Sequence, residues 1–216
     1  MLSKKHFEKG DTLIEVLFAI TVFSMVVVSA LSIMNQGTAA AQRSLEMSLV
    51  TQEVGNQAET LRFLHESYVT NYQNGYESTP GLSVPGQAGQ FYKIVQSIDK
   101  TITQASPFNS PTKCPTPPTG SFILNTRTGA VVMYTPAIFK EAVPYAKLDF
   151  NTTNINILEK AGGIWIEAVK SQPNAADPSQ SGTGYIDFHI RACWSPPGVE
   201  NAVTLGTIVR LYEPRT

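Results

Sequence analysis

The stretch of sequence that decides the fold of this chain is Lys9-Gly10-Asp11-Thr12-Leu13-Ile14-Glu15-Val16. Glu15 stands at the head of an apolar run, and the next charged residue is Arg43. A short lysine-rich segment precedes the run and ends in Gly10. Because an ionised carboxylate is costly beside hydrocarbon, a lone acidic residue in such a place usually marks a function. The pattern predicts a membrane-associated helix in which Glu15 has a specific role.

The apolar run has the length of a membrane-spanning helix. Val16–Met34 carries no charge, and a helix needs about 20 apolar residues to cross a bilayer. Lys4, Lys5 and Lys9 precede it, and positive residues favour the cytoplasmic side. We therefore expect a single-pass protein of the cytoplasmic membrane, with its N-terminus inside.

These residues resemble the N-terminus of a type IV pilin or pseudopilin precursor. In that family a short basic leader ends in glycine, a peptidase cuts directly after it, and Glu is the fifth residue of the mature chain. The resemblance implies that Gly10 and Asp11 form the processing site and that Glu15 guides assembly. It covers this motif and the helix that follows, whereas the rest of the chain matches the family only in architecture.

The resemblance implies a structural filament subunit with four kinds of partner. These are other pilin subunits, a prepilin peptidase and methyltransferase, an assembly ATPase with its platform, and membrane lipid before assembly. The subunit would move from the membrane to a cell-surface pilus or a periplasmic pseudopilus. In the filament, Glu15 would pair with the new amino group at Asp11 of a neighbouring subunit, because a buried carboxylate needs a partner.

The first mature residue departs from the family pattern. Members usually begin with Phe or another apolar residue, whereas this chain has Asp11. The departure favours a minor pilin, but it leaves open whether the new amine is methylated and whether the subunit is abundant. The residues also leave open whether the filament serves motility, adhesion, DNA uptake or protein secretion.

A single long helix is predicted because all 14 prolines fall at Pro80 or later. Thr12 and Glu15 fit a capping box at its start, and we expect it to end near Tyr72. Gly37 is a candidate for a bend. The helix turns amphipathic beyond Arg43. Its apolar stripe consists of Met47, Val50, Val54, Ala58, Leu61, Leu64 and Tyr68.

The C-terminal part reads as an antiparallel sheet. Alternation predicts strands at 164–170, 185–194 and 203–212, joined as a meander, and a hairpin of 121–125 with 130–135. Residues 72–89 and 103–120 read as loops. The segment 91–98 fits either a strand or a short helix, and 140–160 is ambiguous.

The fold class that follows is α+β. We expect a long N-terminal helix, with an apolar transmembrane half and an amphipathic half, packed on the antiparallel β-sheet of a C-terminal domain. The expected parts are a cleaved basic leader (1–10), a transmembrane or filament-core helix segment (11–42) and an extracytoplasmic globular domain (43–216).

Two cysteines lie in the part expected outside the cell. An even number in an oxidising compartment permits one disulfide between Cys114 and Cys193, and two unpaired buried thiols are the alternative. We expect no metal, no cofactor and no enzymatic activity. His65 and His189 belong to no metal-ligand spacing, and His189 and Cys193 lie too far apart along one strand to act as a catalytic pair. The net charge of −1 indicates no nucleic-acid partner.

Other readings of the sequence remain open. Ala39-Ala40-Ala41 resembles the cut site of an ordinary signal peptide, which would release a secreted binding module such as an adhesin or lectin-like domain. A membrane-anchored binding module or extracytoplasmic enzyme is also possible. The aromatic residues Trp165, Trp194, Tyr185 and Tyr212 form either an exposed binding platform or part of the core.

Overall fold

The computed structural model describes residues 11–73, 86–98, 104–170 and 184–213. The chain divides into two compact units after Leu45, a few residues beyond the boundary expected at residue 43. Its elements are α1 (Asp11–Gln73), α2 (Gly86–Ser97), β1 (Phe122–Leu124), β2 (Val131–Met133), β3 (Phe139–Lys140), β4 (Lys147–Phe150), β5 (Leu158–Gly162), β6 (Ile164–Lys170), β7 (Tyr185–Trp194) and β8 (Val203–Tyr212). The fold is α+β, as the sequence predicts.

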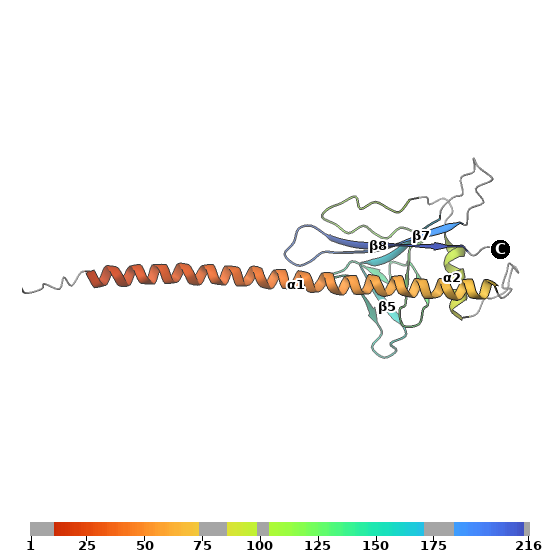
Figure 1. The fold of residues 1–216 in the computed structure, drawn as a ribbon, viewed down its shortest axis with the longest axis horizontal. Helices are drawn as coiled ribbons and strands as arrows, with labels where there is room; N and C mark the ends of the chain where they lie inside the picture. The colour runs from red at the N-terminus through yellow and green to blue at the C-terminus, as the bar shows by residue number, and fades with distance from the viewer. Residues whose placement is uncertain (1–10, 74–85, 99–103, 171–183, 214–216) are drawn as a thin grey trace, which may run out of the picture. The chain divides into compact units, whose positions relative to one another are not determined.

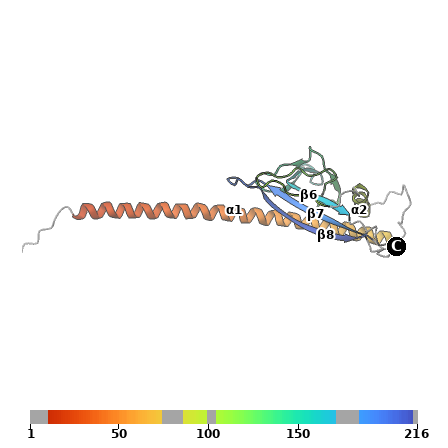
Figure 2. The same cartoon turned by 90° about the horizontal axis from the view of Figure 1, so that it is seen from above.

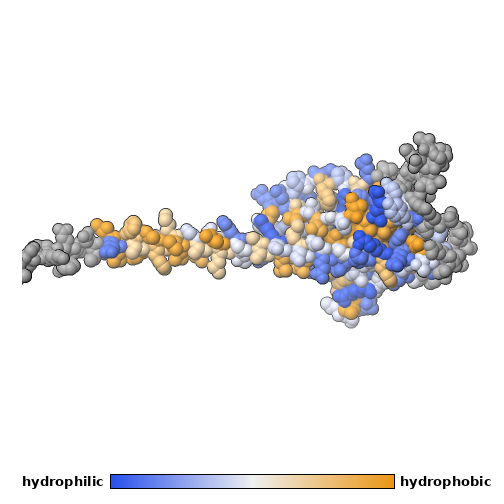
Figure 3. All heavy atoms as spheres, viewed as in Figure 1, coloured by the Kyte–Doolittle hydropathy of each residue, from blue (hydrophilic) through white to orange (hydrophobic). Residues whose placement is uncertain are grey.

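The first unit is the N-terminal part of α1. Apolar side chains around the helix, from Leu13 to Leu45, are exposed, and Figure 3 shows the hydrophobic colour over most of this part of its surface. The helix is continuous through Gly37, the candidate for a bend. One glycine costs a helix at most about 1 kcal/mol, which the turns on either side can absorb.

The second unit is built on a five-stranded antiparallel sheet in the order β2-β1-β6-β7-β8. Figure 2 shows β6, β7 and β8 side by side, as the predicted meander requires. The hairpin of β1 and β2 is also present. Asn125 Oδ1 accepts hydrogen bonds from the N–H groups of Arg127 and Thr128, and Gly129 takes a positive φ of 71° to close the turn.

The ambiguous region from 140 to 160 contributes to a second, small sheet in the order β3-β5-β4. Here β3 pairs with β5 in parallel and β4 pairs with β5 in antiparallel fashion. These strands are short, and a short apolar run gives too few alternations to separate strand from loop.

The second half of α1 lies along the five-stranded sheet (Figure 1). Val50, Val54, Ala58, Leu61 and Leu64 are buried against residues that include Phe122, Phe188 and Val209. The predicted stripe is confirmed except at its start, where Met47 is 39% exposed.

The helix α1 ends at Gln73, as expected near Tyr72. The boundary expected at residue 89 is wrong, because residues 86–89, which were expected in a loop, open α2. The segment 91–98, left open between strand and helix, is helical up to Ser97. Its apolar residues Phe91 and Ile94 face the core three residues apart, which is a helical spacing.

Candidate functional site

Glu15 lies in the second turn of α1, and the apolar side chains around it are exposed. It is the one charged residue between Leu13 and Gln42. Gly10 lies outside the described residues, as do the side chains of Asp11 and Thr12, so the expected processing site and capping box have no described geometry. The backbone of α1 does begin at Asp11, one residue before the expected start.

Three hydroxyl side chains within the apolar segment donate hydrogen bonds to the helix backbone. Thr21 donates to the carbonyl of Phe18 at 2.8 Å, and Ser24 and Ser29 donate to the carbonyls four residues before them. A hydroxyl with an internal acceptor can enter hydrocarbon without an unsatisfied donor. Glu15 is the one charged side chain of this segment, so its burial would call for an external partner.

Among the described residues, α1 is the one helix that is long and apolar enough to cross a membrane. None of the side chains in its most apolar window is buried within the structure. An apolar surface on all sides of a helix needs lipid or other helices around it. The structure therefore supports membrane association of this segment through its length and composition.

Cys114 and Cys193 form a disulfide with a Cα–Cα distance of 5.5 Å. Cys193 lies on β7 and is fully buried, whereas Cys114 belongs to the proline-rich segment between α2 and β1. The bond fastens this irregular segment to the sheet. Disulfides persist in oxidising compartments, so the pairing suits a domain outside the cytoplasm.

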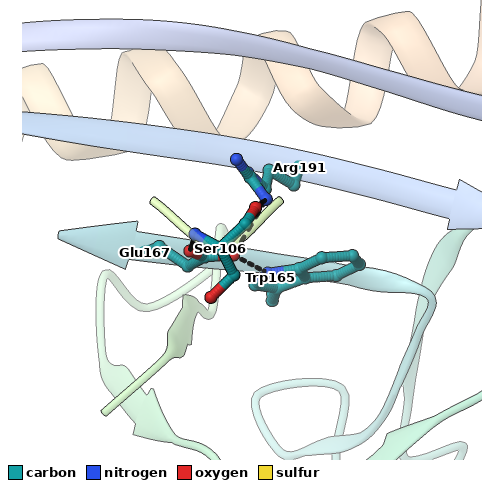
Figure 4. A network of polar contacts seen from close by, with 4 residues as sticks. All are labelled: Ser106, Trp165, Glu167 and Arg191. Atoms are coloured by element: carbon teal, nitrogen blue, oxygen red, sulfur yellow. Dashed lines mark hydrogen bonds and ion pairs between the residues drawn. The ribbon is translucent and has the colours of Figure 1, made fainter. Parts of the chain in front are cut away.

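A second fastening of the same segment comes from a buried charged pair, which Figure 4 shows. Glu167 of β6 is 6% exposed and lies 3.3 Å from Arg191 of β7. The Glu167 carboxylate accepts hydrogen bonds from Trp165 Nε1 at 2.7 Å and from the backbone N–H of Ser106 at 2.8 Å. Arg191 donates to the carbonyl of Ser106. Both backbone groups of Ser106 are thereby tied to the sheet.

The Arg191 guanidinium also lies 4.8 Å from the centre of the Phe108 ring. The Phe108 ring in turn packs 6.1 Å from Trp165. Sequence reasoning missed this network. The alternation of β6 and β7 does place Glu167 and Arg191 on one sheet face, but it cannot show that a loop covers them.

The histidines have separate surroundings. His65 Nε2 donates to the backbone carbonyl of Tyr212 at 2.8 Å and so ties α1 to β8. Burial and the neighbouring charge of Arg191 hold the pKa of His189 below its ordinary value. Cys193 is committed to the disulfide and is no free nucleophile. Within the described ranges, no three His, Cys, Asp or Glu side chains gather to hold a metal ion.

The four aromatic residues considered as a platform do not form one. Trp165 and Trp194 are each 1% exposed and belong to the core. Tyr185 and Tyr212 pair edge to face at 6.2 Å on neighbouring strands, and the Arg210 guanidinium lies 4.0 Å from the Tyr185 ring centre. The tryptophans on β6 and β7 are thus structural.

Comparison with known proteins found no similar protein. The chain matches no protein-family profile, no curated protein sequence and no solved structure.

Proposed function

We propose that this chain is a structural subunit of a type IV pilus or a related pseudopilus filament, made as a precursor and cut between Gly10 and Asp11. One observation carries the proposal: between Leu13 and Gln42, where the helix is apolar on all sides, a single charged side chain, Glu15, lies at the fifth position after Gly10. The continuous helix from Asp11 to Gln73 and the disulfide of the second unit support it.

Before assembly, the apolar segment anchors the subunit in the cytoplasmic membrane with the N-terminus inside. During assembly the same surface leaves lipid and packs against the helices of other subunits. Because lipid tails and apolar side chains are similar environments, this exchange changes little free energy, and polar groups decide the register.

Glu15 supplies that polar group. Cleavage after Gly10 creates a positive amino group at Asp11, which is the partner that a carboxylate in an apolar filament core requires. A subunit in the wrong register would leave Glu15 buried and unpaired, at a cost of several kcal/mol. Pairing between neighbours therefore selects one stagger.

N-terminal sequencing of the mature protein from its native host tests the processing step. We expect the first residue to be Asp11. A first residue of Gln42 would overturn the filament proposal and support a secreted binding module.

A pair of glycine variants tests the same step in the cell. Gly10→Leu should block leader removal, because a side chain at the scissile bond hinders close approach of the backbone. Gly37→Leu is the matched control, since a Cβ there meets nothing within 4 Å. Normal migration of the mature Gly10→Leu protein on a gel would contradict the assigned cut.

A further inference from the structure

The C-terminal end of α1, α2 and the end of β8 enclose a pocket of about 150 Å³ in the second unit. Figure 1 shows these three segments at the same end of the sheet. A cavity of about this volume is large enough to hold a small organic molecule such as benzene. Nothing in the proposed filament role uses this pocket, which lies outside the apolar segment of α1.

Aromatic rings form most of the pocket wall. Tyr68 packs 6.0 Å from Tyr72 and 5.3 Å from Phe91, measured between ring centres. Tyr212, which is 55% exposed, lines the same pocket from β8. The buried apolar side chains of Ile186 and Leu211 also line it. Several ring faces and edges therefore surround one small volume.

One carboxylate, Glu213, is among the residues that line the pocket. It forms an ion pair with Lys170, whose Nζ lies 2.5 Å from Glu213 Oε1. Tyr72 lies one residue before the C-terminal end of α1, where a helix carries about half a negative charge. The last turn of α1 has no basic side chain to offset that charge.

His65 also lines the pocket, and its Nε2 donates to the Tyr212 carbonyl. Burial raises the pKa of Tyr68, and the charges of Tyr72, Tyr92 and Glu213 act in the same direction. The Tyr68 side chain is therefore a neutral phenol, and it lines the pocket.

We propose that this tyrosine pocket binds a small alkylammonium cation, such as a choline or other trimethylammonium group. Tyrosine faces attract a cation through the ring quadrupole, and the attraction grows when the cation loses water. Glu213 and the end of α1 supply the counter-charge. Lys170 competes with the ligand for the Glu213 carboxylate, so the Lys170–Glu213 ion pair weakens binding of the cation.

The test uses the full-length chain in maltoside micelles, which contain no choline headgroup. Binding of choline, tetramethylammonium and 3,3-dimethyl-1-butanol is measured by saturation-transfer NMR on their methyl protons. The alcohol has the shape of choline without its charge. We expect saturable binding of both cations and binding of the alcohol that is about five-fold weaker or more.

Two variants change the counter-charge in opposite directions. Glu213→Gln should weaken choline binding about five-fold, and Lys170→Met should strengthen it by a similar factor, because the carboxylate is freed. Glu59→Gln is the matched control, since it breaks an exposed ion pair with Arg62 outside the pocket. Tyr72→Leu should also weaken binding about five-fold, with exposed Phe63→Leu as its control.

Three results would each overturn the proposal. They are an absence of saturable binding, equal affinity for choline and the neutral alcohol, and unchanged affinity in both Glu213→Gln and Lys170→Met. None of them bears on the N-terminal processing that tests the filament role, so the two proposals fail independently.

Discussion

Glu167 shows how one residue can fix an irregular segment. Its carboxylate accepts from Trp165 and Ser106 and faces Arg191, so a buried charge is almost fully satisfied. Such a pair adds little net stability, but removing one partner is costly because the other charge stays buried and unpaired. An arginine that keeps its charge without a partner must either find water or unfold its surroundings.

Glu167→Gln should therefore lower the free energy of unfolding by about 3–5 kcal/mol, the usual cost of leaving a buried charge unpaired. Urea unfolding of the full-length chain in micelles, followed by tryptophan fluorescence, measures the change. The exposed pair of Glu59 and Arg62 provides the control, because Glu59→Gln should change stability by about 1 kcal/mol or less. Equal effects of both variants would remove the special role of Glu167.

Glu53 should make stability depend on pH. Burial raises its pKa above the ordinary 4.5, and a hydrogen bond with Gln57 only partly offsets this. The folded chain then holds the proton more tightly than the unfolded chain. The resulting contribution to stability is complete below the ordinary pKa and is lost as the pH rises through the raised value.

Glu53→Gln removes that loss. We expect the variant to be more stable than the parent at pH 7, and the difference to vanish as the pH falls toward 4. Thermal unfolding in a series of buffers gives the comparison. A gain of the same size at both ends of the series would mean that side-chain shape, rather than charge, is responsible.

At the scale of elements, one side chain of α1 makes two hydrogen bonds with the backbone of β1, as a neighbouring strand would. Gln57 is fully buried, and its amide donates to the carbonyl of Leu124 at 2.8 Å and accepts from the Leu124 N–H at 3.0 Å. Both backbone groups of one sheet residue are thus satisfied by a helix.

Gln57→Leu should lower the free energy of unfolding by about 2–4 kcal/mol, because it leaves a buried N–H and a buried C=O without partners. Gln52→Leu on the same helix is the matched control, since Gln52 is exposed. Chemical unfolding of both variants measures the two changes in the free energy of unfolding. If the two substitutions had the same effect, helix propensity rather than the hydrogen bonds would be the cause.

The disulfide is the other link between elements. It joins residues 79 positions apart, so its removal should cost about 4–5 kcal/mol in the chain-entropy model. Replacing Cys114 and Cys193 together by serine, with urea unfolding as the measurement, tests this value. Reducing agent should destabilise the parent chain by a similar amount and leave the double variant unchanged. A parent chain insensitive to full reduction would contradict the prediction.

At the scale of the whole molecule, the two units have different surroundings. The second unit buries its own apolar stripe on its own sheet. The apolar side chains of the first unit have no such cover within the described chain and need lipid or other apolar helices. In the proposed filament, Glu15 links membrane insertion to assembly.

Glu15→Val should leave membrane insertion intact, because an apolar residue suits a membrane helix, and should strongly reduce incorporation into filaments. Glu15→Gln, which keeps the shape and removes the charge, should show the same defect. Immunoblots of sheared filaments and of membranes measure the two pools, with exposed Glu59→Gln as the control. Normal incorporation of Glu15→Val would exclude Glu15 from assembly.

Much of the fold could be read from the sequence because its signals are local. The absence of proline before Pro80 and the apolar periodicity predicted α1 and its buried stripe. Alternation gave the bounds of β6, β7 and β8, and short linkers gave their antiparallel order. Each of these follows from the repeat of one element and the length of one connection.

What the sequence by itself determined is the apolar helix, its single carboxylate and the antiparallel meander. Only the tertiary structure decided the helical state of 86–97, the small sheet of β3, β4 and β5, and the pairing of Cys114 with Cys193. It also decided that Glu167 meets Arg191 under a loop and that tyrosines from α1 and β8 line one pocket. These features join segments far apart along the chain, and no local periodicity carries information about which distant segments meet.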